Sequence, residues 1–151
     1  MQDVASNLRI PAHVNNLDLG NQTHREAITF SAITAFVRLM GIYKIANKDA
    51  MALHGGMSQS KYTEIVKKVE NKDKSITALS FDALTRISYM LGIVKSLRIT
   101  YGKDVADKWF TRPNRNRIFA QRRPLEYCLE HGINGLNTVR AFLDAQRGYM
   151  S

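Results

Sequence analysis

The distribution of proline constrains the fold of this chain most strongly. The prolines are Pro11, Pro113 and Pro124, so none interrupts the chain from residue 12 to residue 112. Because proline breaks helices more strongly than any other residue, this long stretch favours an all-α fold. Most glycines stand where the apolar periodicity stops, as C-terminal helix caps with positive φ do. The expected caps are Gly55, Gly56, Gly102, Gly132 and Gly148.

Capping signals and apolar spacing predict where the helices lie. Thr23 and Glu26 fit a capping box, in which both side chains satisfy free amides at a helix start. The helix that follows carries the apolar residues Ile33, Phe36, Val37 and Met40. A second long helix is expected from Ser80, with Asp82 in its first turn. Its apolar stripe is Leu84, Ile87, Leu91 and Val94. Shorter helices are expected over 104–110, 124–131 and 134–147.

The charge balance favours a polyanionic partner. The chain has 22 Lys and Arg against 13 Asp and Glu, a formal charge of +9, and nucleic acid is the first candidate. Residues 48–103 hold more than half of the excess. Cys128 is the only cysteine, which excludes an intramolecular disulfide and favours a reducing cytoplasm. No apolar run is long enough to cross a membrane, and no secretory signal is expected.

Residues 48–67 can be aligned with the helix-turn-helix pattern. In this pattern a small residue lets two helices cross closely, a glycine forms the turn, and two apolar residues of the second helix pack back. The four positions are filled by Ala52, Gly56, Tyr62 and Ile65. Met51 and Met57 add apolar contacts, and Ser58 is placed to cap the second helix. We therefore expect Ala52 to be buried where the helices cross.

The same alignment predicts which side chains face DNA. Gln suits adenine, Lys suits guanine or phosphate, and hydroxyls take either role, while lysines further along contact phosphates. The candidate DNA contacts are Ser58, Gln59, Ser60, Lys61, Thr63, Lys67 and Lys68, with Lys72 and Lys74 beyond them. Glu64 lies beside this face, where it either accepts from a cytosine or pairs with Lys67 or Lys68. The alternative interpretation is a helical hairpin with a solvated lysine face.

The C-terminal part of the chain contains an ordered set of motifs. The order is Trp109, Pro113-Asn114, Phe119, Arg123-Pro124-Leu125, Gly132, Val139-Arg140 and Leu143. This order resembles the toxin-binding domain of the Xre/MbcA/ParS antitoxins, and the similarity extends upstream through residues 52–58 and 79–93. That family often has glycine shortly before the second proline, where this chain has Ala120 and Gln121.

The resemblance implies a type II antitoxin that represses its own operon and neutralises a toxin through its C-terminal domain. The implied partner is a RES-domain toxin, an enzyme that consumes NAD and whose NAD site the antitoxin obstructs. The family also implies a homodimer that binds operator double-stranded DNA. We expect a flexible or loosely docked leader over 1–23, a helix-turn-helix domain over 24–102 and a small toxin-binding domain over 103–151.

Five arginines gather between residues 112 and 123 without one acidic residue. Such a segment attracts anions, which are either DNA phosphates, toxin carboxylates or the acids Glu126, Glu130 and Asp144 of its own domain. The candidate toxin contacts are Trp109, Arg112, Asn114, Arg115, Arg117, Arg122, Arg123, Arg140 and Arg147. Trp109 and Phe119 are better explained as core anchors than as exposed hot spots.

No catalytic, metal or cofactor site is expected. Cys128 and His131 are spaced as neighbours on a helix, but no third group orients them, and a lone cysteine is usually a buried apolar residue. The other histidines do not cluster with carboxylates, and the Gly55-Gly56 pair lacks the rest of a phosphate loop. A non-enzymatic role is therefore favoured. Two alternatives to an antitoxin are a stand-alone helix-turn-helix repressor and a basic RNA-associated structural protein.

Overall fold

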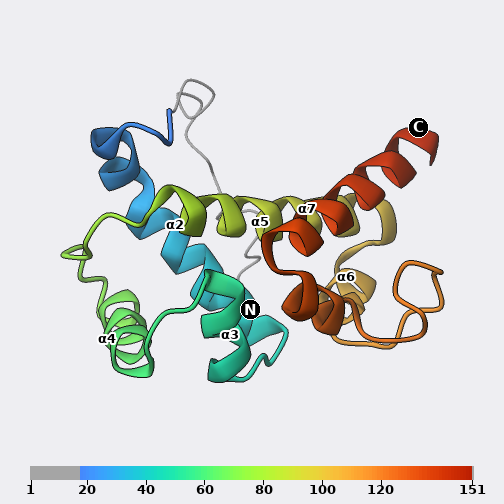
Figure 1. Cartoon of the computed structure of the whole chain (residues 1–151), viewed down its shortest axis with the longest axis horizontal. Helices are drawn as coiled ribbons and strands as arrows, with labels where there is room; N and C mark the ends of the chain where they lie inside the picture. Colours follow the sequence, from blue (N-terminus) through green and yellow to red (C-terminus); the bar gives the residue numbers. More distant parts are fainter. Residues whose placement is uncertain (1–17, 151) are drawn as a thin grey trace.

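The computed structural model describes residues 18–150. They form six helices joined by loops, with no strand among them (Figure 1). This confirms the all-α prediction. Residues 1–17, which make up most of the expected leader, lie outside the described residues. The helices are α2 (Gln22–Ile42), α3 (Asn47–His54), α4 (Gln59–Glu70), α5 (Phe81–Tyr101), α6 (Lys103–Trp109) and α7 (Pro124–Met150).

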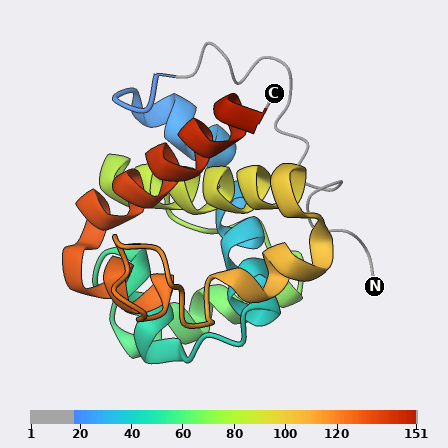
Figure 2. The same cartoon turned by 90° about the vertical axis from the view of Figure 1, so that its right-hand side faces the viewer.

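The helix α5 is the central element of the fold. It packs against α2, α6 and α7, and Figures 1 and 2 both show the second part of α7 running beside it. Its N-cap is Ser80, whose Oγ accepts from the Ala83 amide at 3.1 Å, which confirms the predicted start. Leu84, Ile87 and Val94 are buried as expected, and Leu91 is half-buried.

The helix α2 begins one residue before the expected capping box. Its N-cap is Asn21, whose Oδ1 accepts from the amides of Thr23 at 2.9 Å and His24 at 3.4 Å. The Glu26 carboxylate instead accepts from Gln22 Nε2 at 2.9 Å. The predicted capping box is therefore wrong, because Asn21 offers the same kind of short acceptor side chain two residues earlier.

Two buried hydrogen bonds join α2 to distant parts of the chain. Thr29 Oγ1 accepts from the Leu79 amide at 3.0 Å, which fixes the connection between α4 and α5. The Tyr43 hydroxyl donates to the Ala106 carbonyl in α6 at 3.0 Å. Burial and the nearby Asp107 carboxylate raise the pKa of Tyr43, so the phenol keeps the proton that it donates.

The helix α7 consists of two helical parts that meet at Gly132. This residue has φ 61° and ψ −139°, which are not helical values, so the break predicted between the last two helices is confirmed. A Cβ at Gly135 would lie 3.2 Å from the Cα of Cys128 and 3.2 Å from the carbonyl of Tyr127. Gly148 is not a cap as predicted, because it lies within α7. The missing side chain at Gly135 thus lets the two parts pack closely.

One apolar core runs through the whole described structure, from Ile33 in α2 to Leu143 in α7. Buried residues of α5 pack against α2 and α3 on the N-terminal side of the chain and against α6 and α7 on the C-terminal side. The two halves of the chain therefore share this core. None of the helices formed by residues 18–150 combines the length and the apolar character needed to cross a lipid bilayer.

Candidate functional site

The segment from α3 to α4 is two helices joined by a short turn, an arrangement compatible with a helix-turn-helix. Gly55 caps α3 in the left-handed conformation at φ 114°, and Gly56 follows at φ 94°. Ser58 is the N-cap of α4, and its Oγ accepts from the Lys61 amide at 3.4 Å, as predicted. Tyr62 and Ile65 are buried, also as predicted.

The expected burial of Ala52 is wrong. Ala52 is exposed, and the small residue that is fully buried in α3 is Ala50. Leu53 and His54 are buried on the same helix. The reason is that α3 packs against α5 and α7 as well as α4, so three neighbours, rather than the crossing with α4 alone, decide which face is covered.

The candidate DNA contacts lie on the outer face of α4 and at its start. Six of the seven are exposed, namely Ser58, Gln59, Ser60, Lys61, Thr63 and Lys67. Lys68 is half-buried, and its ammonium forms a salt bridge with Glu64 at 3.2 Å and donates to the Ser75 carbonyl at 2.6 Å. Glu64 therefore pairs with Lys68, which is one of the two roles that its position allowed. This pair leaves Lys61 and Lys67 as the cations at the surface of α4.

A buried histidine lies directly behind this turn. The ring of His54 makes an edge contact with Phe36, with 5.6 Å between centroids, and its Nε2 has no hydrogen-bond partner among the described residues. Burial lowers the pKa of His54 most, and the charge of Arg86 lowers it further; Asp82 raises it in part, and Lys61 adds a smaller lowering. The imidazole is therefore uncharged at neutral pH.

The arginine loop, residues 111–123, is held in shape by its own polar groups. The Asn114 amide donates to the Arg122 carbonyl at 3.0 Å and so joins the two arms of the loop. Asn114 Oδ1 accepts from the Asn116 amide at 2.9 Å. Phe119 is fully buried, and Trp109 is half-buried against it in an edge contact of 5.6 Å. Phe119 is thus a core anchor, as expected.

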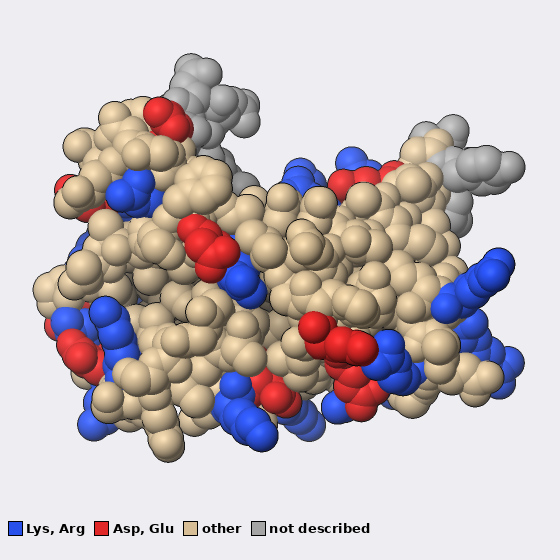
Figure 3. Space-filling model, in the orientation of Figure 1, with Lys and Arg blue, Asp and Glu red and all other residues tan. Residues whose placement is uncertain are grey.

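The arginines of the loop divide into two groups. Arg122 pairs with Glu130 at 2.5 Å and Arg123 with Glu126 at 3.1 Å, and these contacts lower the pKa of both carboxyls. The side chains of the other three arginines of the loop, Arg112, Arg115 and Arg117, are exposed and have no hydrogen bond or ion pair to the described residues. Figure 3 shows Lys and Arg gathered at the right-hand end of the molecule, where Figure 1 draws this loop.

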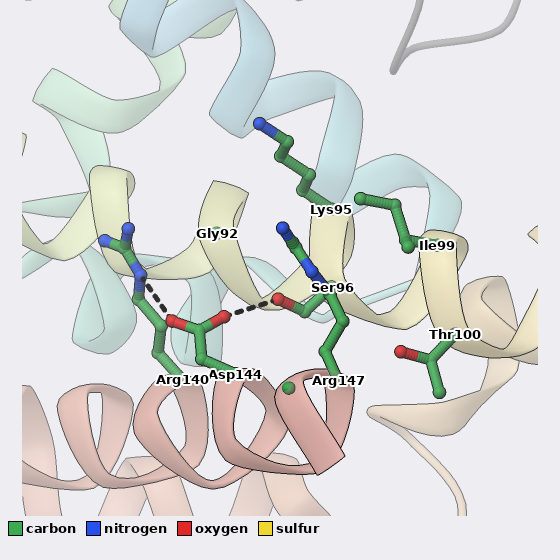
Figure 4. A pocket seen from close by; sticks show the side chains of 9 residues that line it. Gly92, Lys95, Ser96, Ile99, Thr100, Arg140, Asp144 and Arg147 are labelled. Carbon is green, nitrogen blue, oxygen red and sulfur yellow. Dashed lines mark hydrogen bonds and ion pairs between the residues drawn. The ribbon is translucent and has the colours of Figure 1, made fainter. Parts of the chain in front are cut away.

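A hollow of about 780 Å³ lies between α5 and the second part of α7. We call it the α5–α7 groove and define it by its lining residues Lys95, Ser96, Ile99, Arg140, Asp144 and Arg147 (Figure 4). The Ser96 hydroxyl donates to Asp144 Oδ1 at 2.6 Å, and Arg140 Nε lies 3.7 Å from the other oxygen of that carboxylate. Arg140 and Arg147 were expected from the sequence to contact the toxin, whereas no sequence motif pointed to Lys95, Ser96 or Ile99.

The arrangement around Cys128 does not suit nucleophilic catalysis. The thiol is almost completely buried, and burial raises its pKa to about 12. His131 packs its ring on Tyr127, with centroids 4.4 Å apart. Across the described part of the chain, His, Cys, Asp and Glu form no group of three that could hold a metal ion.

Comparison with known proteins identifies the C-terminal part of the chain. Residues 96–148 match the family model described as the antitoxin Xre/MbcA/ParS C-terminal toxin-binding domain. The match begins in the last turns of α5 and takes in α6, the arginine loop and most of α7. No curated protein and no solved structure matches the chain. The match of residues 96–148 supports an antitoxin of the Xre/MbcA/ParS type, as the order of the C-terminal motifs predicted.

Proposed function

We propose that this antitoxin neutralises a RES-type toxin that consumes NAD, and that as a homodimer it represses its own operon by binding operator DNA. The match of residues 96–148 to a toxin-binding domain is the observation that supports the toxin partner most directly. The RES identity of that toxin rests on the resemblance of the whole motif order to this antitoxin family.

The toxin contacts are assigned to the arginine loop. Arg112, Arg115 and Arg117 are exposed on a loop whose backbone is already fixed by hydrogen bonds and by the burial of Phe119. A surface that is ordered before binding loses little conformational entropy on association. Guanidinium groups without internal partners favour carboxylates on the partner. Arg122 and Arg123 are instead assigned to holding the loop against Glu130 and Glu126.

The operator contacts are assigned to α4. Gln59, Ser60, Lys61 and Thr63 are exposed at its start, directly after the Ser58 cap, which is where a recognition helix meets base edges. In Figure 1, whose longest axis is horizontal, α4 lies at the left and the arginine loop at the right. This separation supports two partners bound at opposite ends of the molecule.

Neutralisation is tested with the protein encoded beside this gene. Cells induced for that protein should survive when the full antitoxin is co-expressed, and the purified pair should consume NAD more slowly than the toxin alone. A triple variant, Arg112→Glu, Arg115→Glu and Arg117→Glu, should lose protection. The matched control reverses three exposed cations elsewhere, Arg38→Glu, Lys44→Glu and Lys48→Glu, and should still protect. Equal protection by both variants would remove the arginine loop from the interface.

Operator binding is tested by gel-shift titration on the promoter of the gene and on a scrambled duplex. Gln59→Ala should lose about 1–3 kcal/mol of preference for the operator. Lys67→Ala should weaken both complexes and reduce the salt slope by about 1. A Gln59→Ala protein that discriminates like the parent would show that α4 does not read bases as proposed.

The two alternative functions are separated by the same assays. A stand-alone repressor binds the operator but protects no cell from the neighbouring gene product. A basic RNA-associated protein binds duplex promoter DNA no better than RNA of the same length. The match to a toxin-binding domain favours the antitoxin over both.

A further inference from the structure

We infer that the α5–α7 groove binds an acidic segment of the toxin, in which a carboxylate side chain stands next to an apolar one. This inference rests on the proposed function and assigns the groove, separately from the arginine loop, as a second contact with the same partner.

The α5–α7 groove carries more positive than negative charge. Lys95, Arg140 and Arg147 face it, and the carboxylate of Asp144 is the acid that lines it. That carboxylate is already engaged by the Ser96 hydroxyl and lies near Arg140. Within the described residues, Lys95 and Arg147 have no hydrogen bond or ion pair, so both cations remain available to an anion. Figure 4 shows them on opposite walls, Lys95 on α5 and Arg147 on α7.

The side chain of Arg140, on α7, packs against α5. A Cβ at residue 92 would lie 2.6 Å from Arg140 Nε, so the Arg140 side chain lies directly against the backbone of α5 at Gly92. From there Arg140 reaches over the ring of Tyr89, 5.8 Å from its centroid. Arg140 therefore lies at the Gly92 end of the groove, within reach of a bound segment.

The apolar part of the groove distinguishes a protein segment from a phosphate backbone. Ile99 is 57% exposed on the wall of the groove, one helical turn after Lys95. A large apolar side chain beside two unpaired cations suits an acidic residue with an apolar neighbour, whereas DNA phosphates would gain nothing from Ile99. Ser96, Ile99, Arg140 and Arg147 also lie inside the matched toxin-binding segment.

The test measures the dissociation constant of the full antitoxin for the toxin encoded beside it. The variant Lys95→Glu with Arg147→Glu should bind about tenfold more weakly or worse, and the loss should shrink at high salt because exposed charges are screened. Asp144→Asn keeps an acceptor for Ser96 and removes the negative charge, so its binding should be unchanged or tighter. A control with the same charge change, Lys44→Glu with Lys48→Glu, should bind like the parent.

The outcomes separate this inference from the proposed function. If the parent forms no complex with the toxin, the proposed function fails and this inference fails with it. If the parent binds and the Lys95/Arg147 reversal binds equally well, the groove is not an interface, while the proposed function stands. If Asp144→Asn weakens binding as much as the reversal does, at an unchanged melting temperature, charge complementarity is not the reason for binding.

Discussion

Two consecutive residues of the arginine loop adopt a backbone conformation that favours glycine. Ala120 has φ 49° and Gln121 has φ 66°, and these are the positions near which the antitoxin family often has glycine. For residues with a Cβ this region costs roughly 1–2 kcal/mol each. The loop tolerates this conformation because the Arg122 amide donates a hydrogen bond to the Phe119 carbonyl at 2.9 Å, which closes a turn across these two residues. The fully buried Phe119 side chain anchors this turn.

Replacing Gln121 by glycine should therefore stabilise the protein. Glycine removes the strain but adds backbone entropy to the unfolded chain, so the net gain is about 0.5–1 kcal/mol. Urea unfolding followed by circular dichroism measures it. Ala141→Gly, at an exposed helical position in α7, is the control and should destabilise by about 1 kcal/mol. A Gln121→Gly protein less stable than the parent would contradict the strained conformation.

The buried His54 predicts how stability depends on pH. Its folded-state pKa lies below the ordinary value because burial and the charges of Arg86 and Lys61 oppose protonation. Below about pH 6.5 the unfolded chain takes up a proton that the folded protein does not, so unfolding is favoured by protons. Stability should thus be constant above pH 6.5 and fall as the pH drops from there toward the folded-state pKa.

Unfolding free energies measured between pH 7.5 and pH 5 check this dependence. The slope due to one histidine is at most about 1.4 kcal/mol per pH unit, and the variant His54→Leu should show a smaller slope than the parent. His131→Gln, which removes an exposed histidine, is the control. If His54→Leu keeps the full slope, the proton is taken up elsewhere.

At the scale of single elements, the close packing of the two parts of α7 depends on Gly135. The backbone of Cys128 and Tyr127 lies so close to Gly135 that any side chain would press on it. Backbone atoms cannot move aside as the end of a flexible side chain can, so the contact must be relieved by shifting one part of α7 against the other. The position of the groove-lining residues on α7 depends on this packing.

Gly135→Ala should accordingly cost about 1–3 kcal/mol through overpacking. The control is Gly41→Ala in α2, where a Cβ would meet no atom within 4 Å. Because alanine favours the helix over glycine, this control should raise stability by about 0.5–1 kcal/mol. Thermal melts of both variants measure the difference, and two changes of the same sign would contradict the close packing at Gly135.

At the scale of the whole molecule, α5 makes the two halves of the chain interdependent. Its residues Ile87, Met90, Ile93 and Leu97 are almost completely buried in a core shared by α2, α6 and α7. The matched antitoxin segment begins inside this helix, at Ser96. A chain that ended after α5 would expose this apolar face to water, which costs roughly 25 cal/mol for each Å² of apolar surface.

We therefore expect the protein to unfold in one transition. Trp109 is the only tryptophan and its fluorescence reports on the C-terminal part, whereas circular dichroism reports on all helices together. The two signals should give the same midpoint in urea, as two-state unfolding requires. A fluorescence midpoint that differs clearly from the dichroism midpoint would instead indicate two independently folding domains.

The sequence by itself determined the features that depend on local chemistry. The absence of proline from residues 12–112 predicts the helical fold, Ser58 and Ser80 predict the starts of two helices, and Gly132 predicts the break in α7. Caps and breaks involve groups within a few residues of each other, so their spacing along the chain is enough to find them. The order of the C-terminal motifs likewise predicted the toxin-binding domain whose family model matches residues 96–148.

Only the tertiary structure decided what depends on helix packing. It buries Ala50 rather than Ala52, because α3 meets α5 and α7 as well as α4. It pairs Arg122 and Arg123 with acids of their own domain and leaves Arg112, Arg115 and Arg117 without such partners. It also creates the α5–α7 groove by bringing Lys95 opposite Arg147 across two helices. These contacts join residues far apart in the chain, and their geometry is set by how side chains fill the space between helices.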